Sequence, residues 1–228
     1  MKYAVIGTGK TGQAIADRLP PQDIAALCNS RNPVTLDKLK NADAGIVFVP
    51  GPALASLLPL LIESRLPLVI GTTGYPWPAD LDAQLRQAGT AWIIGQNFSL
   101  GLNVMRYYAQ RLKQSLNALR PGALQLGLSE THHIHKLDAP SGTALYIAGA
   151  LDFPADEIES VREGDAKGTH SVTYGWPHDH ITLTHEALDR AAFAEGVLLA
   201  CAEIAGLEPG LHRFEKLADN KIENSLKG

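Results

Sequence analysis

Three histidines and a lysine fall within five residues near the middle of the chain, at His132, His133, His135 and Lys136. Histidine titrates near neutral pH, so it can supply the proton that a substrate needs when hydride addition builds up negative charge. Lys136 adds a fixed cation that can bind a carboxylate or assist the proton transfer. The segment therefore predicts a site that binds an anion and moves a proton.

Two other interpretations of this segment stay open. A solvated loop rich in histidine would look similar. His132, His133 and His135 could also ligate zinc, but adjacent ligands constrain the geometry poorly, and no carboxylate or cysteine pattern completes the set. We predict no metal.

A second anion site is predicted a few residues later. Ser141, Gly142 and Thr143 follow Pro140 and begin a predicted helix from about Thr143 to Ala150. Backbone amides at the start of a helix attract anions such as carboxylates. The alternative is that these residues form only a turn and a helix cap.

The residues Gly7–Thr8–Gly9–Lys10–Thr11–Gly12 follow a predicted strand and begin a predicted helix. In a dinucleotide-binding turn, the first glycine permits the tight turn, the second lets the backbone approach a pyrophosphate, and the third lets helix and strand pack closely. A phosphate-binding P-loop would need a glycine where Ala4 stands. We therefore predict NADPH or NADH as cofactor.

The end of the second predicted strand bears on the choice of cofactor. An NAD-specific site usually has an acid there for the ribose hydroxyls, whereas this chain has Cys28–Asn29–Ser30–Arg31. Ser30 and Arg31 could hold the 2′-phosphate of NADPH. Arg31 could also be an ordinary solvated arginine.

Short apolar runs alternate with helical patterns through the first hundred residues, which is typical of a parallel sheet covered on both faces. The predicted strands are Lys2–Ile6, Ile24–Cys28, Gly45–Val49, Pro67–Ile70 and Ala91–Ile94. The predicted helices are Thr11–Leu19, Ala53–Ser64 and Ala79–Ala88.

The pattern changes after Asn97 to a long amphipathic helix, Leu102–Leu119, and then a mainly antiparallel region of short strands. These strands are Ala123–Leu128, Val161–Arg162, Ser171–Tyr174 and Ile181–His185. A last helix, Asp189–Ala205, ends at Gly206 as a possible C-cap. We predict an α/β fold: a Rossmann-type dinucleotide-binding domain with a mostly parallel sheet at residues 1–99, to which residues 190–228 return, and a smaller α+β domain at 100–189 for substrate binding and oligomerisation.

The bulk properties fit a cytoplasmic enzyme. Of the 228 residues, 45% are hydrophobic and 19% charged, and a net charge of −4 gives no reason to expect nucleic acid or a membrane as partner. Cys28 and Cys201 lie in apolar runs and are expected to be reduced. The first residues lack the apolar region of a signal peptide, and the most apolar stretches contain prolines or glutamates.

The segment ETHHIHKLDAPSGTA, residues 130–144, resembles the characteristic motif of the 4-hydroxy-tetrahydrodipicolinate reductase family, also called dihydrodipicolinate reductases. Other stretches resemble the family as well, including the loop Gly71–Thr72–Thr73–Gly74, the hinge Asn97–Asn103 and the return helix His185–Gly196.

The resemblance implies a role for each residue. His132 is the proton donor or acceptor, Lys136 a catalytic cation and proton donor, and His133 a substrate contact. Gly142 and Thr143 hold a substrate carboxylate. The nicotinamide site is implied at Gly71, Thr72, Thr73, Gly95, Gln96, Asn97 and Phe98.

The chain departs from the family pattern in three places. Lys10–Thr11 stands where Arg-Met is more usual, which bears on cofactor preference. Glu186 replaces a basic residue, removing a positive charge from the start of the return helix, and little sequence lies between Ala150 and Val161.

The implied activity is reduction of a small dicarboxylate, 4-hydroxy-tetrahydrodipicolinate, to tetrahydrodipicolinate in lysine and diaminopimelate synthesis, by a homotetramer. The alternatives are aspartate or homoserine dehydrogenases, sugar oxidoreductases, or a dinucleotide-sensing protein without turnover. The dehydrogenases and sugar oxidoreductases would lack the paired histidines with Lys136. The dinucleotide-sensing protein would lack the proton donor His132.

Overall fold

The computed structural model describes residues 1–119, 121–122, 124–189 and 191–227. Ala123, Arg190 and Gly228, which fall within predicted segments, lie outside the described residues. The chain divides into two compact units, one formed by Met1–Leu100 with Arg190–Gly228 and the other by Gly101–Asp189.

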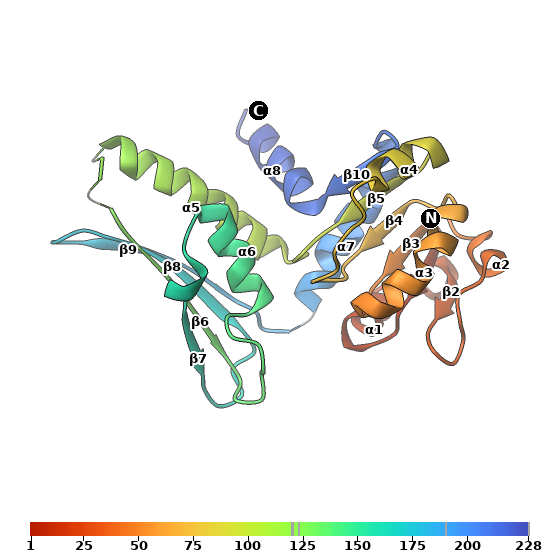
Figure 1. Ribbon diagram of the computed structural model, residues 1–228, viewed down its shortest axis with the longest axis horizontal. Helices are drawn as coiled ribbons and strands as arrows, with labels where there is room; N and C mark the ends of the chain where they lie inside the picture. Colours follow the sequence, from red (N-terminus) through yellow and green to blue (C-terminus); the bar gives the residue numbers. More distant parts are fainter. Residues whose placement is uncertain (120, 123, 190, 228) are drawn as a thin grey trace. The chain divides into compact units, whose positions relative to one another are not determined.

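The first unit is built on a six-stranded, wholly parallel sheet in the order β10-β5-β4-β3-β1-β2 (Figure 1). This confirms the predicted parallel sheet. The chain reverses direction across the sheet between β1 and β3, and ligands of such folds bind beyond the carboxyl ends of strands at this point. The strands are β1 Tyr3–Ile6, β2 Ile24–Cys28, β3 Ala44–Val47, β4 Leu68–Ile70, β5 Ala91–Ile94 and β10 Gly210–Arg213.

Helices cover both faces of this sheet. Leucines of α2 (Leu36–Leu39), α3 (Gly51–Glu63) and α4 (Leu81–Ala88) form one apolar core with the strands. Residues of α1 (Lys10–Ala16) and α7 (Ala191–Glu203) form the other. Burial on both faces explains why the central strands β3, β4 and β5 read as continuous apolar runs.

The second unit is a four-stranded mixed sheet in the order β7-β6-β8-β9, with one face covered by helices α5 and α6. Strand β6 pairs parallel to β7 and antiparallel to β8, and β8 is antiparallel to β9. The elements are α5 Leu100–Leu119, β6 Gln125–His132, α6 Gly142–Leu151, β7 Glu159–Arg162, β8 Thr169–Gly175 and β9 His180–Glu186.

The structure corrects several predicted boundaries. Strand β6 continues to His132 instead of ending at Leu128, so the first histidine of the segment belongs to the strand and does not lie beyond its end. Helix α7 ends at Glu203 and tightens into a 3₁₀ turn, so Gly206 is not its C-cap. Glu186 ends β9 and precedes helix α7, so its charge is not at the helix start.

The remaining elements, except the last 3₁₀ turn, lie outside the predicted segments. Strand β10 and helix α8 (Phe214–Ser225) follow the last predicted helix. The short 3₁₀ turns are Pro21–Asp23, Ala155–Glu157 and Ile204–Gly206. Among the described residues, none of the helices combines the length and apolar character needed to cross a membrane.

Candidate active site

The glycine turn after β1 has the close packing that a dinucleotide-binding turn needs. Gly7 has a φ of +95°, and a Cβ there would lie 2.2 Å from the Phe48 carbonyl oxygen. A Cβ on Gly12 would lie 1.8 Å from the Gly7 carbonyl oxygen, so helix and turn touch here. A Cβ on Gly9 would meet nothing within 4 Å. The middle glycine therefore leaves the backbone open to a ligand, as a pyrophosphate requires.

A cavity of about 460 Å³ lies beside this turn. It reaches from Gly7 and Gly9 to the end of β2 and the start of α3, and its walls are mainly apolar. Such a cavity suits the flat adenine ring of a dinucleotide. Lys10 and Thr11 lie in the first turn of α1, where Lys10 is exposed.

Asn29 ties the end of β2 to the glycine turn. Its amide nitrogen donates to Thr8 Oγ1 at 2.9 Å, and its side-chain oxygen accepts from the backbone amides of Arg31 and Asn32. A hollow next to this contact is lined by Thr8, Gly9, Asn29, Ser30 and Arg31. The structure thus brings Ser30 and Arg31 next to the glycine turn.

A second cavity at the carboxyl ends of β4 and β5 gathers part of the predicted nicotinamide site. Thr72, Thr73, Gly95 and Gln96 line it, together with Tyr75, Trp77 and Arg213, for which the sequence offered no prediction. Arg213 ends β10, a strand that was not predicted, so its position could not be foreseen.

Gly71, Asn97 and Phe98 do not line this second cavity. A Cβ on Gly71 would lie 2.1 Å from the Phe48 ring, and Phe98 is buried against Phe48 and Phe214. Asn97 accepts a hydrogen bond from the Ser99 amide. These three residues therefore contact neighbouring parts of the first unit and do not line the cavity.

In the second unit, Glu130 and His132 point to the same face of β6, since alternate residues of a strand share a face. The Glu130 side chain is fully buried and that of His132 is 9% exposed. Glu130 Oε2 lies 3.4 Å from His132 Nδ1.

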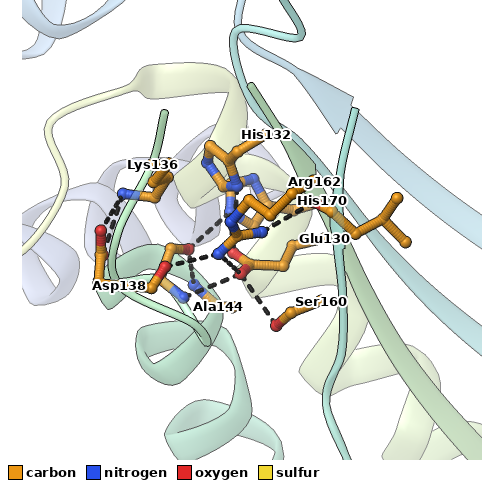
Figure 2. A network of polar contacts seen from close by, with 10 residues as sticks. Glu130, His132, Lys136, Asp138, Ala144, Ser160, Arg162 and His170 are labelled. Atoms are coloured by element: carbon orange, nitrogen blue, oxygen red, sulfur yellow. Dashed lines mark hydrogen bonds and ion pairs between the residues drawn. The ribbon is translucent and has the colours of Figure 1, made fainter. Parts of the chain in front are cut away.

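The other carboxylate oxygen of Glu130 is held by three donors, as Figure 2 shows in part. The Ser141 amide, Ser160 Oγ and Arg162 Nη2 each lie 3.0 Å from Oε1. Arg162 Nη2 also donates to the Asp138 carbonyl oxygen at 2.5 Å. Burial by itself would raise the pKa of Glu130, but the hydrogen bonds from Ser141, Arg162 and Ser160 outweigh it and hold that pKa below its ordinary value.

His170 joins this group from the neighbouring strand. It lies opposite Glu130 in the β6–β8 pairing, with Nε2 3.7 Å from Glu130 Oε2 and 3.3 Å from Ser141 Oγ. Its ring lies 5.2 Å from the ring of His132. Neither Glu130 nor His170 was predicted to have a role. The period-two spacing of Glu130 and His132 is a signal that could have found the first, whereas the second depends on strand register.

Burial is the largest influence on the pKa of His132 and on that of His170. Burial lowers the pKa of His132. The Glu130 carboxylate acts in the opposite direction, and the charges of Lys136 and Arg162 lower this pKa further. Burial, with the neighbouring His132, lowers the pKa of His170 to about 4, so His170 is neutral at pH 7.

Lys136 pairs with Asp138 in the loop that follows β6, at 2.8 and 3.0 Å from the two carboxylate oxygens (Figure 2). His133 is half-buried, while His135 is exposed with its ring 6.2 Å from that of His133. The histidine segment therefore separates into one buried residue, His132, and more accessible ones.

Helix α6 begins at Gly142, and Ser141 caps it by accepting a hydrogen bond from the Ala144 amide at 3.1 Å. A Cβ on Gly142 would meet nothing within 4 Å, so the first turn of the helix is open beside this residue. Glu130 connects this helix start to His132, because it accepts from the Ser141 amide.

One group of residues has the types and proximity that a metal ion needs. The nearest ligand atoms of Glu130, His132 and His170 lie within 4.8 Å of one another. The expectation that no carboxylate accompanies the histidines was wrong, because Glu130 lies on the same face of β6 as His132, and strand pairing adds His170. Arg162 already supplies a cation to Glu130, which makes a divalent ion electrostatically less favourable there. The absence of a metal stays a prediction.

Comparison with known proteins gives one consistent result. Residues 101–217 match the family model described as "Dihydrodipicolinate reductase, C-terminus". The 4-hydroxy-tetrahydrodipicolinate reductase of Methanopyrus kandleri is 32% identical, over 91% of this chain and 78% of that protein. The enzyme of the same name from Akkermansia muciniphila is 30% identical, over 91% of this chain and 93% of that protein.

Solved structures show the same fold. A dipicolinate-bound dihydrodipicolinate reductase from Paenisporosarcina sp. TG-14 matches with a TM-score of 0.71, at 21% identity over 95% of this chain and 98% of that one. An amine dehydrogenase from Mycobacterium smegmatis matches with a TM-score of 0.60 at 10% identity, over 94% of this chain and 95% of that one. The Rossmann-type architecture predicted from the sequence is confirmed.

Proposed function

The chain belongs to the 4-hydroxy-tetrahydrodipicolinate reductase family, and from this premise we propose that it reduces 4-hydroxy-tetrahydrodipicolinate to tetrahydrodipicolinate with NADPH or NADH. The observation that carries the proposal is the grouping of His132, Lys136 and the open start of α6 at Gly142 within the unit that matches the family model.

The reaction replaces the substrate's hydroxyl group by hydrogen. A hydride is added to the ring, and the hydroxyl group takes up a proton and leaves as water, so one hydride and one proton are consumed. When bound, NADPH supplies the hydride. The chain must supply orientation, a proton path and charges that match a dianion.

His132 is the proton donor or acceptor of this reaction. It is buried at the end of β6, and Lys136, a partly accessible cation, lies in the loop that follows. Lys136 is the second catalytic group, which stabilises negative charge on the substrate and donates a proton. A positioned acid of this kind contributes about 10²- to 10⁴-fold to a rate.

Two separate sites hold the two carboxylates of the substrate. Lys136 binds one end. Gly142 and Thr143, at the start of α6, bind the other, where Gly142 offers an approach without a side chain. The half-buried His133 contacts the substrate between them.

The dinucleotide binds to the first unit. The turn Gly7–Gly12 holds the pyrophosphate, with its closest approach at Gly9. Thr72, Thr73, Gly95 and Gln96 surround the nicotinamide, and Gly71, Asn97 and Phe98 support them. Arg31 favours NADPH because its positive charge can bind the 2′-phosphate. Asn29 adds no negative charge that would repel this phosphate, and its side-chain oxygen accepts hydrogen bonds from backbone amides.

We further infer a homotetramer in the cytoplasm that serves lysine and diaminopimelate synthesis, with no nucleic acid or membrane partner. The sheet face of the second unit that α5 and α6 do not cover supports assembly, since it carries paired hydroxyls that another sheet can contact. The buried, unpaired thiols Cys28 and Cys201 suit a reducing compartment. Analytical ultracentrifugation tests the oligomeric state.

The activity is tested by following NADPH oxidation with substrate made freshly from pyruvate and aspartate semialdehyde. The proposal predicts rapid oxidation that needs both precursors and withstands dialysis against EDTA. His132→Gln should bind NADPH normally and turn over about 10²- to 10⁴-fold more slowly. Lys136→Ala should weaken both substrate binding and turnover. Without substrate-dependent oxidation by the wild type, the proposal fails.

A further inference from the structure

We propose that Glu130 is the positioning residue of the proton donor. Its Oε2 atom holds His132 in the tautomer that carries a proton on Nδ1, so that Nε2 is the atom that exchanges a proton with the substrate. This inference rests on the proposed function and assigns a role to a buried residue that touches neither substrate nor cofactor in that proposal.

The Glu130 carboxylate is fixed in one orientation. Three donors converge on Oε1 at 3.0 Å each, from Ser141 at the start of α6 and from Ser160 and Arg162 of β7. These donors come from two separate elements, so the carboxylate cannot rotate without breaking bonds to both. The arrangement also keeps Glu130 ionised, because donors stabilise the charged form.

The second oxygen is left for the histidines. Among the described residues, Glu130 Oε2 and His132 Nδ1 have no hydrogen-bond partner of normal geometry, although both are buried. They lie 3.4 Å apart, so a shift of a few tenths of an ångström would form a bond of normal length. A proton on Nδ1 satisfies both atoms. With Nδ1 unprotonated, two lone-pair acceptors would face each other in a buried space, which is costly.

Gly168 lies beside the other nitrogen of the His132 ring, Nε2. Its φ is +143°, and a Cβ there would lie only 3.0 Å from His132 Nε2. The chain therefore places a fixed carboxylate against Nδ1 and a residue without a side chain against Nε2. This asymmetry is what a proton donor with one working nitrogen requires.

Several charged or titratable groups face His132 and affect its protonation. They are Glu130 of its own strand, Lys136 and Asp138 of the following loop, Arg162 of β7 and His170 of β8, with His185 of β9 beside His170. Lys136 and Arg162 oppose a positive charge on His132, and Glu130 is the buried carboxylate that favours it. Loss of the Glu130 charge should therefore make the imidazolium form less stable.

The test compares Glu130→Gln with Glu159→Gln. Both remove one negative charge from neighbouring strands of the same sheet, but Glu159 is exposed. We expect Glu130→Gln to lower kcat at least about tenfold, with KM changed much less and NADPH affinity unchanged. In the kcat/KM profile, the loss of activity as pH rises should move to lower pH by roughly one unit, because the carboxylate no longer supports protonated His132. Glu159→Gln should match the wild type.

The wild-type tautomer can be measured directly, which keeps the test open if Glu130→Gln does not fold. Nitrogen NMR of the histidine rings, with His132 identified by its loss in His132→Gln, should show the proton of neutral His132 on Nδ1. A proton mainly on Nε2 would overturn the proposal.

The possible failures are distinct. A wild type without reductase activity would overturn the proposed function itself. An active wild type with an unshifted pH profile in Glu130→Gln would overturn only the role of Glu130. Activity that EDTA abolishes and zinc restores would also overturn it, because Glu130, His132 and His170 would then be metal ligands.

Discussion

The ammonium group of Lys136 lies 2.8 and 3.0 Å from the carboxylate oxygens of Asp138, so the cation proposed to bind the substrate is already paired within its own loop. A substrate carboxylate must compete with Asp138 for this cation. We expect Asp138→Asn to tighten binding of pyridine dicarboxylate by roughly twofold to fivefold, the range for a partly exposed ion pair. Inhibition constants measure this effect. Asp156→Asn, which removes a charge from an exposed turn, should leave binding unchanged, and weaker binding in Asp138→Asn would contradict competition.

The start of α6 is expected to discriminate between dicarboxylates and monocarboxylates. In the wild type, pyridine dicarboxylate should inhibit competitively and the matching monocarboxylate much more weakly. Gly142→Val should abolish this difference and raise the substrate's KM, because a side chain would fill the open approach, while NADPH binding stays unchanged. Gly149→Val in the same helix, also in open space, is the control. Equal inhibition of the wild type by both compounds would exclude the two-site binding of a dianion.

Arg31 should set the cofactor preference. We expect NADPH to be used at least as well as NADH, and Arg31→Ala to weaken NADPH binding more than NADH binding, since only NADPH offers a 2′-phosphate to the guanidinium group. Fluorescence titration with both cofactors measures this. Arg18→Ala, an exposed arginine just beyond α1, should affect neither. If Arg31→Ala weakened the two equally or had no effect, Arg31 would be an ordinary surface residue.

Gly168 should be required for turnover and not for cofactor binding. Gly168→Ala would bring a methyl group to 3.0 Å from His132 Nε2, and we expect kcat to fall at least about tenfold. Gly164→Ala is the comparison, because Gly164 also has a positive φ (+46°) but has no neighbour within 4 Å of its Cβ position. An unchanged kcat in Gly168→Ala would contradict a role for the space beside Nε2.

His170 should make the fold sensitive to acid. Its pKa is about 4 in the folded chain and 6.5 in the unfolded chain, so the unfolded state binds more protons between these values and stability falls as pH falls through this window. At pH 5 this lowers the free energy of unfolding by about 2 kcal/mol relative to pH 7. His170→Gln should lose less stability on going from pH 7 to pH 5, as measured by urea unfolding. An equal loss in both proteins would contradict the assignment.

The features that were predicted well depend on residues that lie close together in the sequence. The turn from Gly7 to Gly12 combines a tight turn and close packing, both of which follow from glycine at fixed spacing. The strands Ile24–Cys28 and Ala91–Ile94 have the predicted bounds. Ala91–Ile94 is a continuous apolar run because it is buried on both faces of a parallel sheet.

The features that were missed depend on contacts between distant segments. Strand β6 was predicted to stop at Leu128, since the buried residues that continue it are polar and are stabilised by partners on other elements. His170 reaches Glu130 through the register of β6 and β8, which no local pattern encodes. Strand β10 contains His212 and Arg213 and lacks an apolar run, so only its pairing with β5 identifies it.

The reductase activity is tested most directly by tracing the hydride. NADPH carrying deuterium at the transferred position is incubated with the chain and with substrate generated from pyruvate and aspartate semialdehyde, and the product is examined by mass spectrometry. We predict tetrahydrodipicolinate that contains one deuterium, formed in step with NADPH oxidation and greatly slowed in His132→Gln. The absence of deuterium from the product, or NADPH oxidation that does not depend on the substrate, would contradict the proposed function.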